Sequence, residues 1–189
     1  LLKQNNLYVM ANKKRNNIEN LIKEGAKEIK SYEEIKDIEL NCLMLCVTNT
    51  PIAIAIAKKV SPLLKNTTLV IDLTTHNKDG AGEMKDIFNK YKISFVVSPV
   101  MGSKNESTKG ILGSIWGGDE NNFEESKLYL DTFCKNIFNF GSVEQACAAK
   151  LLSNFLSLLT TTTVIEYFKS AKKLDVDWRK LFEVAKLGS

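Results

Sequence analysis

The sequence predicts an α/β protein in which a doubly wound sheet is followed by helices alone. Up to residue 141, apolar runs of strand length alternate with stretches of helical period, a pattern typical of consecutive βαβ units. After residue 141 the apolar residues follow only the helical period. Residues 145–172 are expected to form one unusually long helix, and residues 176–186 are expected to form another. No linker, repeat or low-complexity segment interrupts the chain, so we expect two domains, 1–141 and 142–189, that meet at the start of the long helix.

Each expected element is marked by its own local signal. Residues 42–47 are apolar throughout, which predicts a strand that is buried on both faces of a parallel sheet. Gly25 follows the helical stretch 16–24 and is expected to end it. The other expected elements are strands at 9–11, 27–29, 68–72, 93–97, 112–116 and 136–139 and helices at 32–35, 51–64, 79–91 and 121–133.

Composition and charge argue against several classes of protein. Of the 189 residues, 44% are hydrophobic and 25% are charged, which is enough for the core of one domain and part of a second. The 26 basic and 22 acidic residues are interspersed, and their net charge of +4 indicates neither a nucleic-acid nor a membrane partner. The four cysteines lack C-x-x-C spacing, so no metal site or disulfide framework is expected, and reduced thiols fit a cytoplasmic protein. The given sequence contains no signal-peptide pattern and no uninterrupted apolar run of about 18 residues, although a missing N-terminus would hide any leader.

Lys150 and Asn154 lie four residues apart in the apolar opening of the expected long helix. That spacing places both side chains on one helix face. An ammonium beside a carboxamide offers a proton donor and an orienting hydrogen-bond partner to a bound molecule. The ordinary alternative is a lysine that extends from a packed helix into solvent beside a polar neighbour, so the pair needs support from elsewhere in the chain.

A second feature lies upstream, where a strand-like run ends at Pro99 and opens into the turn Met101-Gly102-Ser103. A glycine-containing turn after a strand exposes backbone N–H groups, and such groups suit a carboxylate. The two features together predict a site for a small anionic molecule that also exchanges a proton.

The order of these motifs resembles the β-hydroxyacid dehydrogenase family, which includes 3-hydroxyisobutyrate dehydrogenases and glyoxylate or succinic semialdehyde reductases. The resemblance rests on the loop Met101-Gly102-Ser103, on a Gly-Gly-Asp turn, and on Lys150 and Asn154. It extends over essentially the whole chain. It implies a Rossmann-type dinucleotide-binding domain, a small carboxylate substrate and a homo-oligomer. It further implies that Lys150 is the general acid and base, that Asn154 orients the substrate, and that the Met101, Gly102 and Ser103 loop binds the substrate carboxylate.

The chain also departs from the family pattern. Met101 stands where serine is usual, and Glu144 and Ala146 occupy positions that are usually glycine, so the close backbone approach that those glycines allow is not expected. The G-x-G-x-x-G turn that binds a pyrophosphate is absent from the sequence. We therefore interpret the chain as an internal fragment that starts in the first helix of the family fold and stops before its last helices.

The resemblance also indicates which residues contact the cofactor. The segment after the first strand of this chain has no acidic residue and begins with Asn-Lys, which resembles the family's NADP-associated Asn-Arg pair. NADP is therefore expected, with NAD as the alternative, and a solvated charge run is the ordinary interpretation of the same lysines. Loops at the carboxyl ends of the next strands are expected to run along the dinucleotide. The predicted cofactor-binding residues are Asn12, Lys13, Lys14, Val47, Thr48 and Thr75.

Three aromatic side chains have competing interpretations. His76 is the chain's one histidine, but the family position is not catalytic, and we expect it in a solvent-facing loop. Trp116 and Trp178 are expected to fill core or interhelical space.

The resulting hypothesis is an oxidoreductase that transfers a hydride between NAD(P) and a small β-hydroxyacid or its semialdehyde. A non-catalytic relative that binds a peptide or protein is the alternative. Loss of the glycine pair and the presence of Met101 favour the alternative, whereas retention of Lys150 and Asn154 favours the enzyme.

Overall fold

The computed structural model describes residues 5–11 and 15–187 and confirms the predicted α/β architecture with a helical end. The strands are β1 (Tyr8–Val9), β2 (Lys27–Glu28), β3 (Cys42–Leu45), β4 (Leu69–Asp72), β5 (Ser94–Val97), β6 (Val100–Met101), β7 (Leu112–Trp116) and β8 (Cys134–Asn139). The α-helices are α1 (Asn16–Lys23), α2 (Thr50–Val60), α3 (Lys78–Asn89), α4 (Lys104–Lys109), α5 (Phe123–Leu130), α6 (Val143–Lys173) and α7 (Trp178–Leu187). Three short 3-10 helices are η1 (Tyr32–Asp37), η2 (Ser61–Leu63) and η3 (Glu120–Asn122).

The central sheet is parallel, in the order β3-β4-β5. A second sheet, β6-β7-β8, pairs β6 antiparallel and β8 parallel to β7. An antiparallel bridge between Val97 and Gly117 joins the two sheets through two backbone hydrogen bonds of 2.9 Å. The strands β1 and β2 form a separate parallel pair.

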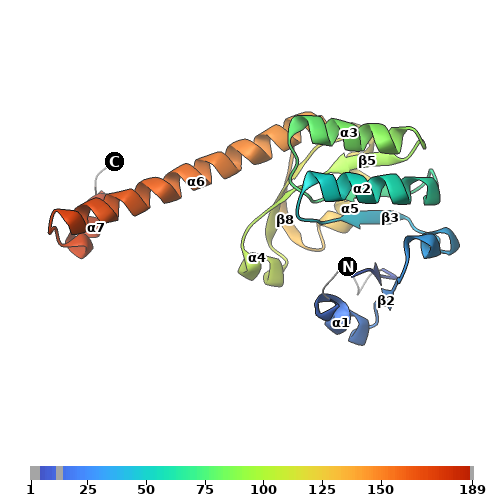
Figure 1. The fold of residues 1–189 in the computed structure, drawn as a ribbon, viewed down its shortest axis with the longest axis horizontal. Helices are drawn as coiled ribbons and strands as arrows, with labels where there is room; N and C mark the ends of the chain where they lie inside the picture. The colour runs from blue at the N-terminus through green and yellow to red at the C-terminus, as the bar shows by residue number, and fades with distance from the viewer. Residues whose placement is uncertain (1–4, 12–14, 188–189) are drawn as a thin grey trace. The chain divides into compact units, whose positions relative to one another are not determined.

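Helices cover both faces of the central sheet, as the apolar strands predict. Val70 and Phe95 belong to a core cluster that also contains buried residues of α2, α3 and the start of α6. Their neighbours Ile71 and Val96 belong to a second cluster that includes Leu130 of α5. In Figure 1, α2 and α3 lie side by side on the first of these faces. Successive side chains of one strand therefore stabilise opposite layers, which is the doubly wound arrangement.

Three elements differ from the sequence expectation. The residues after Pro99 form β6 and the short helix α4 instead of an open turn, and α5 ends at Leu130, three residues earlier than expected. The remaining strands and helices agree with the predicted segments to within a few residues at their ends.

Packing divides the chain into two compact units inside α6, between Lys150 and Leu151. The second unit contains the rest of α6 and α7, and within it the Phe168 ring contacts Trp178 and Phe182 at centroid distances of 6.2 Å. The predicted domain boundary between residues 141 and 142 stays a prediction.

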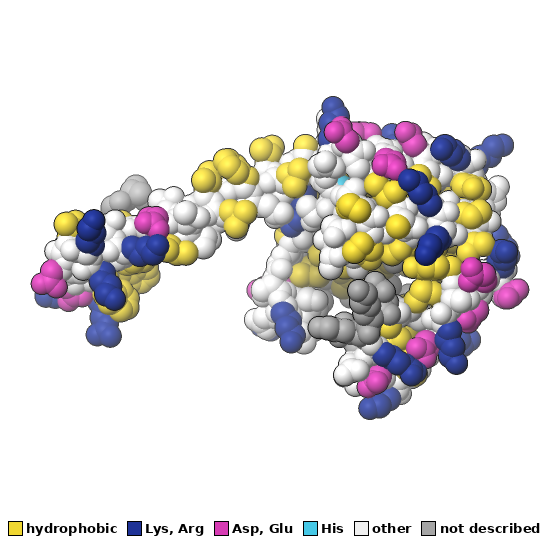
Figure 2. All heavy atoms as spheres, viewed as in Figure 1, with side chains coloured by type: hydrophobic (Ala, Val, Ile, Leu, Met, Phe, Trp, Pro, Cys, Tyr) yellow, Lys and Arg dark blue, Asp and Glu magenta, His cyan; other side chains and the backbone are white. Residues whose placement is uncertain are grey.

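Large apolar side chains of α6 in the second unit are exposed, and Figure 2 shows them along the helix. They include Leu151, Leu152, Phe155, Leu156, Leu158 and Leu159. By length and composition, α6 is also the one helix in residues 5–11 and 15–187 that could cross a membrane, with a mean hydropathy of 1.2 over its best window. A core helix of a soluble protein passes the same test, so this finding does not decide the predicted absence of a membrane partner.

Candidate active site

Apart from Lys150, the predicted site residues that the structure describes in the first unit lie in the loops, or in the short strand β6, that follow the carboxyl ends of three neighbouring strands. Thr48 follows β3, Thr75 follows β4, and Met101, in β6, follows β5. Because parallel strands end at the same edge of a sheet, these loops share one edge of the first unit. This edge is where open α/β sheets bind ligands.

Lys150 reaches this edge from the start of α6. Its side chain is buried, with 9% of the residue exposed, and its Nζ donates a 2.9 Å hydrogen bond to the carbonyl oxygen of Val100. Burial lowers the pKa of the Lys150 ammonium below its ordinary value, because the charged form loses solvation. An ammonium has three donors, so the bond to Val100 leaves capacity for the oxygen of a ligand.

The start of α6 approaches β7 closely because residue 117 is glycine. A Cβ at Gly117 would lie 2.5 Å from the Cβ of Ala146 and would also overlap the carbonyl oxygen of Ser142. The N–H of Gly118 donates a 2.8 Å hydrogen bond to the carbonyl oxygen of Gly141, just before the helix. Close packing of α6 against the end of β7 therefore depends on Gly117, whereas the predicted loss of the backbone approach that glycines at positions 144 and 146 would allow stays a prediction.

The predicted substrate loop is held by its pairing with β7. Val100 lies opposite Ser114 and Met101 opposite Gly113, and the buried hydroxyls of Ser98 and Ser114 are 2.5 Å apart. Gly102 follows with a φ of +129°, a conformation that other residues rarely adopt. The loop therefore presents the Val100 carbonyl to Lys150 from a fixed register.

Ser103 is engaged within its own segment. Its N–H donates a 2.8 Å hydrogen bond to the carboxylate of Glu106, and its hydroxyl contacts the same carboxylate, which forms a capping box at the start of α4. These bonds lower the pKa of Glu106. A substrate carboxylate would have to compete with Glu106 for Ser103, so the predicted role of Ser103 stays a prediction.

The structure describes three of the six predicted cofactor-binding residues. Thr48 and Thr75 are exposed at the shared edge, whereas the N–H of Val47 donates a 3.2 Å hydrogen bond to the hydroxyl of Thr74. Asn12, Lys13 and Lys14 lie outside the described residues. Asn154 lies on α6 one turn beyond Lys150, in the second unit.

His76 is buried, with 1% of the residue exposed, so the expectation of a solvent-facing histidine is wrong. Its Nε2 lies 2.8 Å from Oδ2 of Asp72 and its Nδ1 lies 2.9 Å from the hydroxyl of Thr50. A buried imidazole needs partners for both nitrogens, and Asp72 and Thr50 provide them. The only sequence signal for this group is an acidic residue at a strand end with a histidine four positions later.

The thiols and carboxylates of the described residues form no group of three or more that could hold a metal ion. Cys42, Cys134 and Cys147 are free, and burial raises their pKa values to about 12, 11 and 12. A cavity of about 10 Å³ lies between η1 and η2, at the opposite edge of the sheet, and is large enough for at most about one water molecule. Neither feature competes with the edge that carries Lys150.

Comparison with known proteins agrees with this geometry. The chain is 25% identical over 183 residues to a probable mitochondrial 3-hydroxyisobutyrate dehydrogenase of Dictyostelium discoideum, a match that covers 96% of this chain and 57% of that protein. The solved 3-hydroxyisobutyrate dehydrogenase of Mycobacterium tuberculosis superposes with a TM-score of 0.82 at 21% identity, over 89% of this chain and 57% of that one. An imine reductase of Myxococcus stipitatus in complex with NADP+ superposes with a TM-score of 0.83 at 17% identity, over 95% of this chain and 62% of that one.

These likenesses confirm the Rossmann-type fold, and the chain spans about three-fifths of the length of these relatives. A family model described as the NAD binding domain of 6-phosphogluconate dehydrogenase matches residues 1–141, which is most of the chain. The resemblance to β-hydroxyacid dehydrogenases is thereby confirmed at the level of the family. The sequence match over residues 1–141 shows that this chain belongs to the family of NAD binding domains of 6-phosphogluconate dehydrogenase.

Proposed function

We propose that the natural protein is an NAD(P)-dependent oxidoreductase that acts on a small β-hydroxyacid or the corresponding semialdehyde. The observation that supports it most is the buried ammonium of Lys150, 2.9 Å from the carbonyl oxygen of Val100 in the predicted substrate loop. A bound nicotinamide would supply the hydride. The chain would supply orientation and proton transfer.

Lys150 is proposed as the general acid and base. In the reductive direction its ammonium would donate a proton to the carbonyl oxygen, and in the oxidative direction its neutral amine would accept the hydroxyl proton. The lowered pKa supports both roles, since it brings the two protonation states closer in free energy near neutral pH. Asn154 is proposed to orient the substrate, and the loop from Met101 to Ser103 to bind its carboxylate.

The cofactor is proposed to be NADP, with NAD as the alternative. Thr48 and Thr75 fit a dinucleotide because they expose hydroxyls at the carboxyl ends of β3 and β4. The bound NADP+ of the structurally similar imine reductase supports the same choice. The relative in Dictyostelium discoideum, named as a probable 3-hydroxyisobutyrate dehydrogenase, supports the substrate class.

The test is the rate of hydride transfer in the full-length natural protein and in its Lys150→Ala variant. Loss of a positioned proton donor lowers the rate by roughly 10²–10⁴-fold, while dinucleotide affinity should stay nearly unchanged. Lys109→Ala, which removes an exposed lysine of α4, is the matched control and should keep the natural rate. A Lys150→Ala variant that retains more than about half of the rate would exclude Lys150 as the proton donor.

If the natural protein is instead a non-catalytic binding protein, it should show no turnover with any β-hydroxyacid. The burial of Lys150 against the substrate loop does not favour that alternative, because a lysine without a chemical role has little reason to lose its solvation.

A further inference from the structure

A buried carboxylate at the end of β4 connects the two loops that carry the predicted cofactor-binding residues Val47, Thr48 and Thr75. Asp72 is wholly buried, and its two side-chain oxygens have different partners. Oδ1 accepts a 2.8 Å hydrogen bond from the N–H of Thr74, and Oδ2 lies 2.8 Å from Nε2 of His76. Because a buried carboxylate must be hydrogen-bonded to be tolerated, both contacts fix the loop that follows β4.

Each of these partners then reaches across to the loop that follows β3. The hydroxyl of Thr74 accepts a 3.2 Å hydrogen bond from the N–H of Val47, and Nδ1 of His76 lies 2.9 Å from the hydroxyl of Thr50, the first residue of α2. Thr50 and Val47 lie on either side of Thr48, so the β3–α2 loop is attached at both ends to groups that Asp72 holds.

The side chain of Thr50 is fixed from its other side as well. A Cβ at Gly80, in the first turn of α3, would overlap the methyl group of Thr50, so this methyl lies directly against the glycine. The start of α2 and the start of α3 therefore meet at Thr50. With its methyl group against Gly80, the Thr50 side chain places its hydroxyl 2.9 Å from Nδ1 of His76.

We propose that Thr50, His76 and Asp72 form a clamp that sets the spacing between the β3–α2 and β4–α3 loops and so positions Thr48 and Thr75 for the dinucleotide. The proposal rests on the proposed function, because it deepens the assignment of the same cofactor site. Asp72, His76 and Thr50 act as positioning residues and need not touch the ligand.

A hydroxyl, an imidazole and a carboxylate joined by hydrogen bonds also occur in the catalytic triads of hydrolases, but the arrangement here differs. In those enzymes the carboxylate binds Nδ1 and the nucleophile binds Nε2, whereas here Asp72 faces Nε2 and Thr50 faces Nδ1. His76 is also 1% exposed, so its ring has no access to a substrate. The geometry fits a structural clamp better than a catalytic triad.

The test compares Thr50→Val with Thr50→Ser in the full-length natural protein. Valine keeps the shape of threonine but leaves Nδ1 of the buried His76 without its partner, whereas serine keeps the hydroxyl. Leaving such a group unpaired should raise the dissociation constant for NADPH about tenfold in Thr50→Val, with kcat at saturating cofactor little changed. Thr50→Ser should restore most of the affinity.

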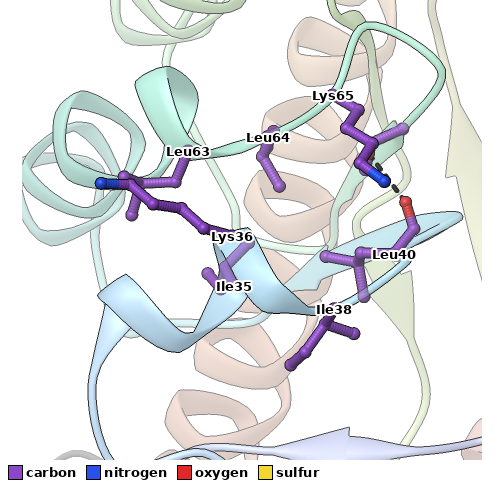
Figure 3. A pocket seen from close by; sticks show the side chains of 8 residues that line it. Ile35, Lys36, Ile38, Leu40, Leu63, Leu64 and Lys65 are labelled. Carbon is purple, nitrogen blue, oxygen red and sulfur yellow. Dashed lines mark hydrogen bonds between the residues drawn. The ribbon is translucent and has the colours of Figure 1, made fainter.

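A matched control lies at the opposite edge of the same sheet. The Thr68 hydroxyl is also buried and donates a 2.8 Å hydrogen bond to the carbonyl oxygen of Leu40, beside the small cavity shown in Figure 3. Thr68→Val should therefore destabilise the fold to a similar extent without changing the dissociation constant. If Thr68→Val weakens NADPH binding as much as Thr50→Val does, general destabilisation accounts for both and the clamp is wrong.

Amide hydrogen exchange separates failure of the clamp from failure of the proposed function. The clamp predicts that Thr50→Val speeds exchange in residues 46–50 and 73–76 relative to Thr68→Val and that Thr50→Ser does not. Unchanged exchange in both segments would overturn the clamp whether or not the natural protein binds a dinucleotide. If the natural protein binds neither NADPH nor NADH, the proposed function fails and the positioning role fails with it, while the exchange pattern still shows whether the two loops are joined.

Discussion

Replacement of Gly117 by alanine tests how Lys150, the proposed proton donor, is placed. The new Cβ would lie 2.5 Å from the Cβ of Ala146, whereas an ordinary contact needs 3.4 Å, so the start of α6 must move by about 0.9 Å or the overlap must be absorbed as strain. Neither an alanine Cβ nor the overlapping carbonyl of Ser142 can rotate away. Overpacking of this kind costs roughly 1–3 kcal/mol of stability. A displacement near 1 Å can also lower turnover by up to about 10²-fold, since it stretches the bond from Lys150 to Val100.

The assay is urea-induced unfolding of the natural protein and of two glycine variants, followed by their rates of hydride transfer. Gly82→Ala is the matched control, because a Cβ at Gly82 in α3 meets nothing within 4 Å. Alanine favours a helix over glycine by about 1 kcal/mol, so this variant should be slightly more stable and fully active. A Gly117→Ala variant with the stability and the rate of the natural protein would refute the argument that residue 117 sets the position of α6.

Three further outcomes are expected. Because burial lowers the pKa of Lys150, the rate of oxidation should rise with pH and level off below the pH at which an ordinary lysine titrates. The rate of reduction should fall over the same pH range. Rates that do not change with pH in this range would contradict the role of Lys150 as general acid and base. The natural protein should show a higher kcat/KM with NADPH than with NADH. Asn12 and Lys13 are followed by basic residues and by no carboxylate, which suits the 2′-phosphate of NADPH. A preference for NADH would disprove the cofactor assignment. The isolated 189-residue chain should self-associate in analytical ultracentrifugation through the exposed apolar side chains of α6. Because its sequence has no G-x-G-x-x-G turn, it should show no NADPH binding by calorimetry, and tight stoichiometric binding would contradict the assigned cofactor site.

Strands and helices with a strong period could be predicted from the sequence. The strand at residues 42–45 and its neighbours β4 and β5 are apolar along most of their length, and such short apolar runs are typical of strands inside a parallel sheet. The two-residue strand Val100–Met101 could not be predicted, since it exists only through its pairing with β7, more than ten residues away. The helix α4 had a local signal that was open to detection, the capping-box spacing of Ser103 and Glu106.

The site could be predicted only in part, for a similar physical reason. Lys150 is recognisable because its neighbours in sequence are apolar and small. The burial of His76 depends on Asp72 and on Thr50, which lies on another element, and a single polar loop residue carries no period that would show this. The glycine that permits the close packing of α6 lies in the turn after β7, so its role depends on a tertiary contact that the sequence of the helix does not show.

The oxygen that holds Lys150 belongs to the main chain, and this has an evolutionary consequence. Since every residue has a carbonyl oxygen, a substitution at position 100 changes the side chain near the ligand without removing the acceptor of the lysine. The side chains of the loop can therefore diverge while Lys150 keeps its hydrogen-bond acceptor. Under the proposed function, this separation would let substrate choice evolve independently of the proton-transfer step.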